Sequence, residues 1–225
     1  MWMTMQKIPK LLKSEKELGQ IYPPRSEATS PPSNIEFFRG FSAQYKYNDI
    51  RTLFHLFNGE VSLFTRKLVP VKEYNLTPLM KEQLLSLKLD ESKFQLLDGG
   101  IMRHLTIKRE NPLVLWDILV HDGYHLLGTT YRHRYSLLKN TCGDPTEFEK
   151  DTKNEVGLKI GKGPLWLAPS FQRDFGRLYQ KTIGTDYLEG IILKDVNAKL
   201  DSGASERNNT SWQIKIRKPT KSTMF

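Results

Sequence analysis

Asn58-Gly59 separates two runs rich in β-branched and aromatic residues, TLFHLF before it and EVSLFT after it. Asn and Gly both tolerate the positive φ angles that a two-residue type I′ turn requires, and such turns join neighbouring antiparallel strands. Residues 43–66 are therefore predicted to form strands, with a hairpin turn at residues 58–59. The fold is expected to contain an antiparallel sheet close to its start.

Further segments alternate between strand and helix character. A second hairpin is predicted between LVLWDILV and YHLLG, around the turn His121-Asp122-Gly123. Helices are predicted from Thr77-Pro78, over YRHRYSLLKN as far as Gly143, and from Pro169-Ser170 onward, and strands for KFQLLDGGIM, YLEGIILKD and SWQIKIRK. No regular element is predicted for the charged, glycine-containing segment 144–164. Strands grouped around a few interspersed helices indicate an α+β domain.

Residues 1–35 differ in character from the rest of the chain. They contain a candidate polar helix at residues 11–18, followed by IYPPRSEATSPPS, whose four prolines oppose regular helix and sheet. We therefore expect an N-terminal helix and proline-rich arm over residues 1–35. One domain is expected over residues 36–225, since a chain of 225 residues with 38% hydrophobic content can bury one good core.

The charge balance favours a polyanionic partner. The chain has 34 Lys+Arg against 25 Asp+Glu, a net charge of +9, which suits phosphate neutralisation on nucleic acid. Its single cysteine, Cys142, excludes an internal disulfide and a cysteine cluster for zinc. No run approaches the roughly 20 apolar residues that span a bilayer, so we expect a cytoplasmic protein that does not contact a membrane.

Six short motifs occur in a fixed order, each on or beside a predicted strand: KYNDIR, LFTR, LLDGG, LVLWDIL, EGIILK and IKIR. Any one of them alone is compatible with a surface charge or a core aromatic. Their order resembles that of the covalent nucleotidyltransferases, which include ATP-dependent DNA ligases, RNA ligases and messenger-RNA capping enzymes. The resemblance covers residues 22–217. The phrases YPPRSEATSPPS and AQYKYND are also similar to a group of phage-type and bacterial ligase-like proteins.

The resemblance implies an ATP-grasp-like ligase/capping-enzyme nucleotidyltransferase domain of antiparallel sheets flanked by helices. Only eight residues follow Arg217, so we expect this chain to have no OB domain, the domain that closes over the nucleotide in DNA ligases and capping enzymes. A partner protein or a domain in trans is then expected to replace it.

The first motif of the family places the nucleophile at Lys46, which would attack the α-phosphate of ATP, or less readily of GTP. An amine attacks phosphorus only when it is unprotonated, and neighbouring cations disfavour the ammonium form. By resemblance, Lys194, Lys215 and Arg217 supply those cations and grip the α-phosphate. Arg51 matches an arginine just downstream of the lysine in many ligases.

The resemblance also assigns the acidic residues. Glu189 matches the carboxylate of the fourth motif and would hold Mg²⁺, or Mn²⁺, through water. Asp98 is expected in the site as a third-motif residue and a second metal ligand. Two positions depart from the family: Asp49 stands where the family has glycine, and Gly100 stands where most members have a glutamate that binds ribose or metal. Asp49 would favour a protonated Lys46 and repel the triphosphate.

The remaining matches concern the nucleotide. Trp116 corresponds to the aromatic residue that stacks on the purine, and it precedes the matching Asp117. Arg66 corresponds to an arginine that contacts the ribose or the nucleic-acid end, and Arg134 matches an arginine after the second hairpin.

The function predicted from these motifs is an ATP-dependent polynucleotide ligase acting on nicked or broken ends, with RNA favoured over DNA. Lys46 would be adenylated, AMP would pass to a 5′-phosphate, and a 3′-hydroxyl would displace it. Two alternatives stay open. One is a capping-type guanylyltransferase, and the other is a catalytically degenerate protein that binds nucleotides or nucleic-acid ends.

Overall fold

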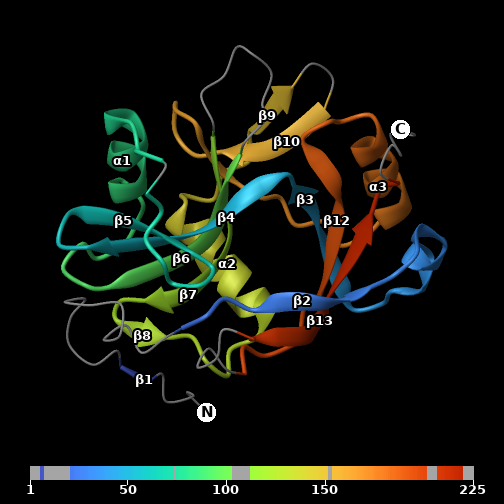
Figure 1. Cartoon of the computed structure of the whole chain (residues 1–225), viewed down its shortest axis with the longest axis horizontal. Helices are drawn as coiled ribbons and strands as arrows, with labels where there is room; N and C mark the ends of the chain where they lie inside the picture. Colours follow the sequence, from blue (N-terminus) through green and yellow to red (C-terminus); the bar gives the residue numbers. More distant parts are fainter. Residues whose placement is uncertain are drawn as a thin grey trace.

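The computed structural model describes residues 6–7, 21–72, 74–102, 112–151, 154–201 and 207–219. The helix predicted at residues 11–18 lies outside these ranges. Two sheets stand next to each other, the larger on the left of Figure 1 and the smaller on the right. Among the described residues, no helix combines the length and apolar character needed to cross a membrane.

The larger sheet has the strand order β5-β4-β6-β7-β11-β10-β9, and β8 joins β7 to β1. Its strands are β1 (Gln6–Lys7), β4 (Asp49–Phe57), β5 (Glu60–Thr65), β6 (Gln95–Met102), β7 (Leu113–His121), β8 (Tyr124–His125), β9 (Phe148–Asp151), β10 (Asn154–Lys159) and β11 (Leu165–Leu167). The β4–β5 hairpin is confirmed, with φ of 49° at Asn58 and 72° at Gly59. The β7–β8 hairpin is confirmed too, since Asp122 and Gly123 have φ of 49° and 78°.

The smaller sheet has the order β2-β13-β12-β3. Its strands are β2 (Arg25–Thr29), β3 (Phe41–Tyr47), β12 (Leu188–Asp195) and β13 (Asn209–Arg217). Only Asn48 separates β3 in this sheet from β4 in the larger one, and its N–H donates to the carbonyl of Tyr187 at 2.8 Å. The chain thus crosses from one sheet to the other two residues after Lys46.

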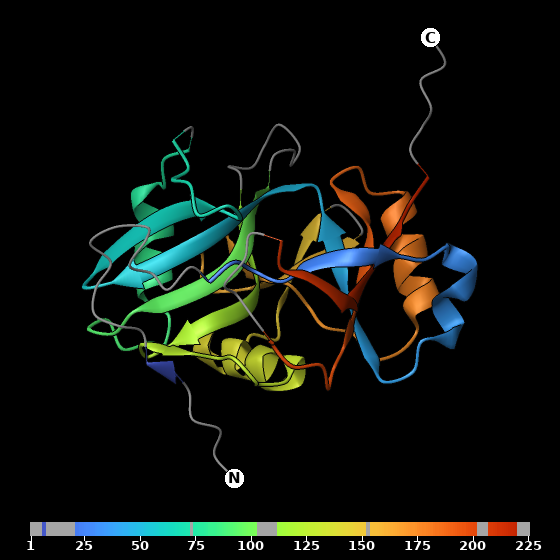
Figure 2. The ribbon, with the colours of Figure 1, turned by 60° about the horizontal axis from the view of Figure 1, so that its bottom comes forward.

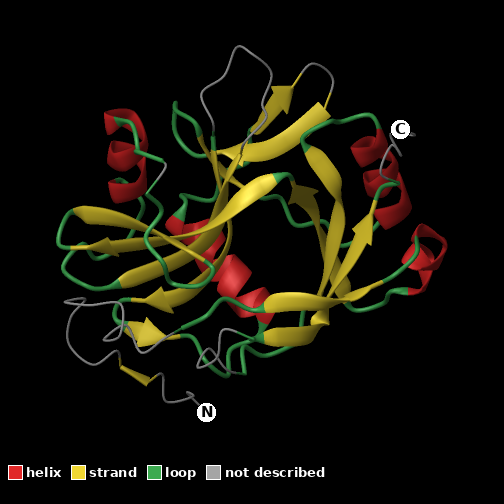
Figure 3. Cartoon of the chain, in the orientation of Figure 1, coloured by secondary structure: helices red, strands yellow, loops and turns green. Residues whose placement is uncertain are grey.

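Helices pack against both sheets (Figure 3), and the 3₁₀ helix η1 (Pro32–Phe37) packs against α3. The α-helices are α1 (Pro78–Leu85), α2 (Tyr131–Thr141) and α3 (Phe175–Ile183). The predicted start of α1 is confirmed, because the Thr77 side chain caps it by accepting from Met80 N at 3.3 Å. Helix α2 contacts β7 of the larger sheet, and α3 contacts β12 of the smaller one.

Helix α3 starts at Phe175, later than the predicted start at Pro169-Ser170. The reason is a backbone pairing of Phe171 with Ala43, whose two N–H groups donate to each other's carbonyl at 2.8 and 2.7 Å. This pairing holds the preceding segment extended against β3. Asp174 then turns the chain with a φ of 57° before the helix begins.

Two segments are more regular than predicted. Within the proline-rich arm, Arg25–Thr29 forms β2 parallel to β13, because the prolines lie on either side of RSEAT and leave its N–H groups available. The segment 144–164 contains β9 and β10. The sheets are mixed, since β7–β11 is a second parallel pair. The division at residue 35 stays a prediction.

One apolar core joins the two sheets. Tyr47 and Ile191 from the smaller sheet share a cluster with Met102 and Val114 from the larger sheet, and each of these side chains is at most 2% exposed. The turned view of Figure 2 shows the two sheets meeting around this region. Such close packing resists displacement, so side chains that project from the two sheets toward each other are held in a fixed arrangement.

Candidate functional site

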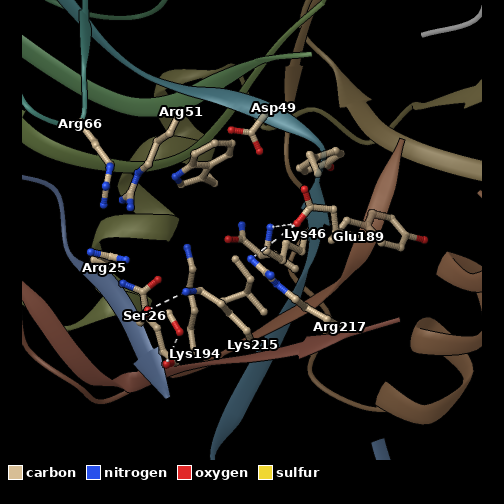
Figure 4. Close-up of a pocket in the computed structure, with 16 residues that line it drawn as sticks. Arg25, Ser26, Lys46, Asp49, Arg51, Arg66, Glu189, Lys194, Lys215 and Arg217 are labelled. Atoms are coloured by element: carbon tan, nitrogen blue, oxygen red, sulfur yellow. Dashed lines mark hydrogen bonds and ion pairs between the residues drawn. The ribbon is translucent and has the colours of Figure 1, made fainter. Parts of the chain in front are cut away.

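A pocket of about 330 Å³ lies at the junction of the two sheets. All of the residues predicted for the site except Asp98 line it, namely Lys46, Arg51, Arg66, Trp116, Glu189, Lys194, Lys215 and Arg217. Figure 4 shows the labelled cations among them pointing into one shared space from both sheets. Residues from five of the six motifs, spread over 46–217, therefore converge in a single pocket, and LLDGG is the exception.

Strand register explains why the small-sheet cations share a face. Gly190 on β12 pairs with Lys46 on β3 and with Arg217 on β13. Two residues further along β12, Ile192 pairs with Lys215. Since side chains alternate between faces every residue, these partners project to the same side of the sheet.

The backbone conformation at position 190 also requires glycine. Its φ is +139°, and a Cβ there would lie 2.1 Å from the carbonyl oxygen of Ile216. The pairing of β12 with β3 shifts register between Leu188 and Gly190, a bulge that places Glu189 at the pocket. Glu189 accepts a short hydrogen bond from Lys46 Nζ, and its carboxylate lies 4.0 Å from Arg217 Nη2.

Lys194 and Lys215 are two lysines that line the pocket. Lys194 is 3% exposed, and its Nζ lies 4.6 Å from the centroid of the Tyr131 ring. Burial lowers the pKa of Lys194 to about 8, although Asp117 and Asp98 oppose the shift. Lys215 Nζ donates to the carbonyl of Ser26 at 2.7 Å, and burial followed by the charge of Arg217 lowers its pKa.

The lowered pKa of Lys194 predicts a pH dependence of anion binding. Only the ammonium form attracts phosphate, so raising the pH through about 8 is expected to remove this charge and weaken the binding of a phosphate-bearing ligand such as a nucleoside triphosphate. Calorimetric titration should show affinity falling about tenfold from about pH 7 to about pH 9. The variant Lys194→Arg keeps its charge over this range, so its profile should be flatter. If binding by the wild type and by Lys194→Arg depends on pH in the same way, Lys194 is not the group that causes the dependence.

Asp98 does not line the pocket but is bonded to Arg51, which does. It is 1% exposed, and its two oxygens accept from Arg51 Nε at 2.9 Å and from Arg51 Nη2 at 2.5 Å. Arg51 also donates to the carbonyl of Pro24 at 2.9 Å, which ties it to the start of β2. This geometry favours a positioning role for Asp98 over the expected metal ligation. The described residues contain no cluster of three or more His, Cys, Asp or Glu side chains suited to a metal.

Trp116 and Asp117 point to opposite sides of β7. Trp116 is partly buried and lines the pocket, whereas Asp117 is 1% exposed and faces α2. There its oxygens accept from Arg134 Nε at 3.0 Å and Nη2 at 3.1 Å. Arg134 is fully buried and lies outside the pocket. Its ion pair with Asp117 joins α2 to β7.

Several pocket residues were not predicted from the sequence. Arg25 and Ser26 reach the pocket from β2, and Gln44 and Gln213 reach it from β3 and β13. Arg25 and Ser26 were overlooked because the proline-rich arm was expected to be irregular. The strand alternation of QYK and QIK was the signal for the two glutamines, since each lies two residues before a predicted site lysine.

Comparison with known proteins gives a match at the level of the fold. No family model matches the sequence, and no curated protein matches it. The fold is similar to that of the mycobacterial DNA ligase D complexed with ATP and MES (TM-score 0.61, 17% identity, 88% of this chain and 60% of that one). It is also similar to the ligase domain of LigD from M. tuberculosis (TM-score 0.60, 17% identity, 88% and 60%).

A Lig E DNA ligase, described as binding DNA with a minimal scaffold, matches with a TM-score of 0.51 at 13% identity, over 88% of this chain and 70% of that one. The chain spans 60% of the length of the two ligase D structures. Its fold is that of these DNA ligase domains, so the expected α+β fold with flanking helices is confirmed, although the sheets are mixed where antiparallel sheets were expected.

Proposed function

We propose that this protein is an ATP-dependent polynucleotide ligase in which Lys46 carries AMP covalently. The observation that carries the proposal is the position of Lys46. Its amine lies in a pocket lined by Lys194, Lys215 and Arg217, in a fold shared with a ligase solved with ATP. A nucleophilic amine among phosphate-binding cations suits attack on a nucleoside triphosphate.

In the first step, the unprotonated Nζ of Lys46 attacks the α-phosphorus of ATP. A P–N bond forms, the P–O bond to the leaving pyrophosphate breaks, and the amine loses a proton. The three cations Lys194, Lys215 and Arg217 offset the negative charge on the phosphates. Trp116 provides the aromatic face on which the purine stacks.

The residues of the pocket also fit a divalent cation. Mg²⁺ is commonly held by one or two carboxylates together with phosphate oxygens and water, and Glu189 lies beside Lys46 at the pocket with its side chain 36% exposed. Such an ion would neutralise charge on the phosphates when bound. In the structure the Glu189 carboxylate accepts from the Lys46 ammonium, which holds the nucleophile in place.

In the later steps, an oxygen of a 5′-phosphate end takes AMP from Lys46, and a 3′-hydroxyl then attacks that phosphate and releases AMP. The net charge of +9 suits binding to the phosphates of the two ends. The sequence favours RNA over DNA as the substrate, while the solved neighbours are described as DNA ligases. Nicked and single-stranded ends of both nucleic acids are therefore the substrates to compare.

The test is intact mass after incubation with ATP and Mg²⁺ or Mn²⁺. We expect the wild-type protein to gain the mass of one AMP moiety, and Lys46→Ala to gain none. Lys93→Ala is the matched control, because Lys93 is exposed and lies outside the pocket. Label on Lys46→Ala equal to that on the wild type would refute the assignment.

Two other outcomes would select the alternatives. An adduct formed with GTP in preference to ATP would point to capping-type guanylyl transfer. No adduct with either nucleotide, combined with salt-sensitive binding to nicked duplexes, would indicate a binding protein without turnover.

A further inference from the structure

Asp49 and Gly100, the two positions at which the motifs depart from the family, are neighbours in the larger sheet. Antiparallel pairing of β4 with β6 sets Asp49 opposite Met102 and Arg51 opposite Gly100. Asp49 is thus the diagonal neighbour of Gly100, and the two positions share a face of the sheet.

The space beside Gly100 is already filled. A Cβ built on Gly100 would lie 2.7 Å from Asp49 Oδ1 and 2.8 Å from Trp116 Cη2. Such separations are far below ordinary contact distances, so a side chain at residue 100 and the present position of Asp49 exclude each other. The Asp49 carboxylate and the outer edge of the Trp116 indole thus both border the space that a side chain at residue 100 would occupy.

The Asp49 carboxylate is available to a ligand. Asp49 is partly buried and lines the pocket, and Figure 4 shows its carboxylate directed into the shared space, on the side away from Lys194 and Lys215. No described residue forms a side-chain hydrogen bond with it. Burial raises the pKa of Asp49 to about 7, against the opposing charges of Lys46 and Arg51. The Asp49 oxygens are therefore open to a hydrogen-bond donor of a ligand in the pocket.

We propose that Asp49 accepts hydrogen bonds from the sugar hydroxyls of a ribonucleotide whose base stacks on Trp116, and that Gly100 provides the room for it. The proposal rests on the assignment of this pocket as a nucleotide site. A base on Trp116 and phosphates on Lys194 and Lys215 leave the sugar between them. A carboxylate accepts from hydroxyl groups and repels phosphate, so hydroxyls are the part of the ligand that fits Asp49.

The test compares AMP with 2′,3′-dideoxyadenosine monophosphate by calorimetry in EDTA. Asp49→Ala is expected to bind AMP about 10- to 100-fold more weakly than the wild type, the range of a hydrogen bond to a charged group. Binding of the dideoxynucleotide, which lacks both hydroxyls, should not weaken. Asp49→Asn keeps the size of the side chain and should lose part of the preference for AMP.

Each other outcome overturns the proposal. If Asp49 only repels phosphate, Asp49→Ala will bind both nucleotides more tightly. If Asp49 only holds a metal, its replacement will weaken both nucleotides equally and only when Mg²⁺ is added. Equal binding of the two nucleotides by the wild type would show that no hydroxyl is recognised.

The steric exclusion predicts a reciprocal rescue. Gly100→Glu alone should bind AMP poorly, because its Cβ would meet Asp49 and Trp116. Combining Asp49→Gly with Gly100→Glu removes the contact with Asp49, and only the outer edge of the Trp116 ring then has to shift. The carboxylate moves to the neighbouring strand, and AMP affinity should return to within about tenfold of the wild type. If the double variant binds AMP no better than Gly100→Glu alone, a carboxylate at residue 100 does not replace the one at residue 49. Thermal unfolding of each variant confirms that it is folded.

The mass measurement on the wild type separates this inference from the proposed function. Sugar discrimination that depends on Asp49, without any adduct from ATP, would retain the inference and reject covalent catalysis. An AMP adduct on Lys46, combined with unchanged discrimination between AMP and the dideoxynucleotide in Asp49→Ala, would support covalent catalysis and reject the inference about Asp49.

Discussion

Replacing Lys46 with alanine is expected to abolish sealing that starts from ATP and to spare sealing of a strand that already carries a 5′-adenylate. The first reaction requires a nucleophile at Lys46, whereas the last step needs only the 3′-hydroxyl and a site that binds AMP. We expect at least about a thousandfold loss with ATP, the scale seen when a covalent nucleophile is removed. Denaturing gels with 5′-phosphorylated and 5′-adenylated ends, in RNA and in DNA, measure both reactions.

The comparison has a built-in control for damage to the pocket. Lys46 also forms an ion pair with Glu189, so its loss could disturb that carboxylate. Retained sealing of the adenylated strand would show that the rest of the pocket still works. If Lys46→Ala loses both reactions equally, Lys46 positions the nucleic-acid end and does not carry AMP. Lys93→Ala should behave as the wild type in both.

Local turn chemistry made much of the larger sheet predictable. Asn58-Gly59 and Asp122-Gly123 each adopt the positive φ angles that their residue types indicate, and each joins the two expected strands. Thr77 before Pro78 likewise starts α1 as its type suggests. In these places a few consecutive residues decide the conformation.

Long-range pairing explains where prediction from the sequence was less successful. The strand Arg25–Thr29 depends on β13, far along the chain, and the extended segment at Phe171 depends on Ala43. Neither partner can be identified from local residue preferences. Proline content and helical periodicity were therefore misleading guides to residues 21–33 and to the start of α3.

The pocket also combines features that local sequence motifs predict with features that depend on strand pairing. The pocket lysines, and its arginines other than Arg25, were predicted from their motifs, and alternation along strands then brings Lys46, Lys215 and Arg217 to one face. The surroundings of the acidic residues depend on contacts between strands. Asp98 is held by Arg51, and Asp49 fills the space left at Gly100, neither of which a linear sequence displays.

Removing Arg134 is expected to destabilise the fold more than any pocket substitution. Arg134 is fully buried, and it donates to both oxygens of Asp117 and, at 2.8 Å, to the carbonyl of Thr129. Arg134→Met would leave the Asp117 carboxylate buried without its cation, at a cost of about 3 to 5 kcal/mol in the free energy of unfolding. Urea denaturation followed by fluorescence and circular dichroism measures this loss.

Replacing both partners by apolar residues provides the matched control. Arg134→Met combined with Asp117→Leu removes both charges, so it should cost less than the sum of the single variants. Additive losses would show that the two charges contribute independently. The same pair also affects the pocket, because the charge of Asp117 opposes the lowering of the Lys194 pKa. Asp117→Asn should therefore lower that pKa further, and the loss of ATP affinity with rising pH should begin at a lower pH than in the wild type.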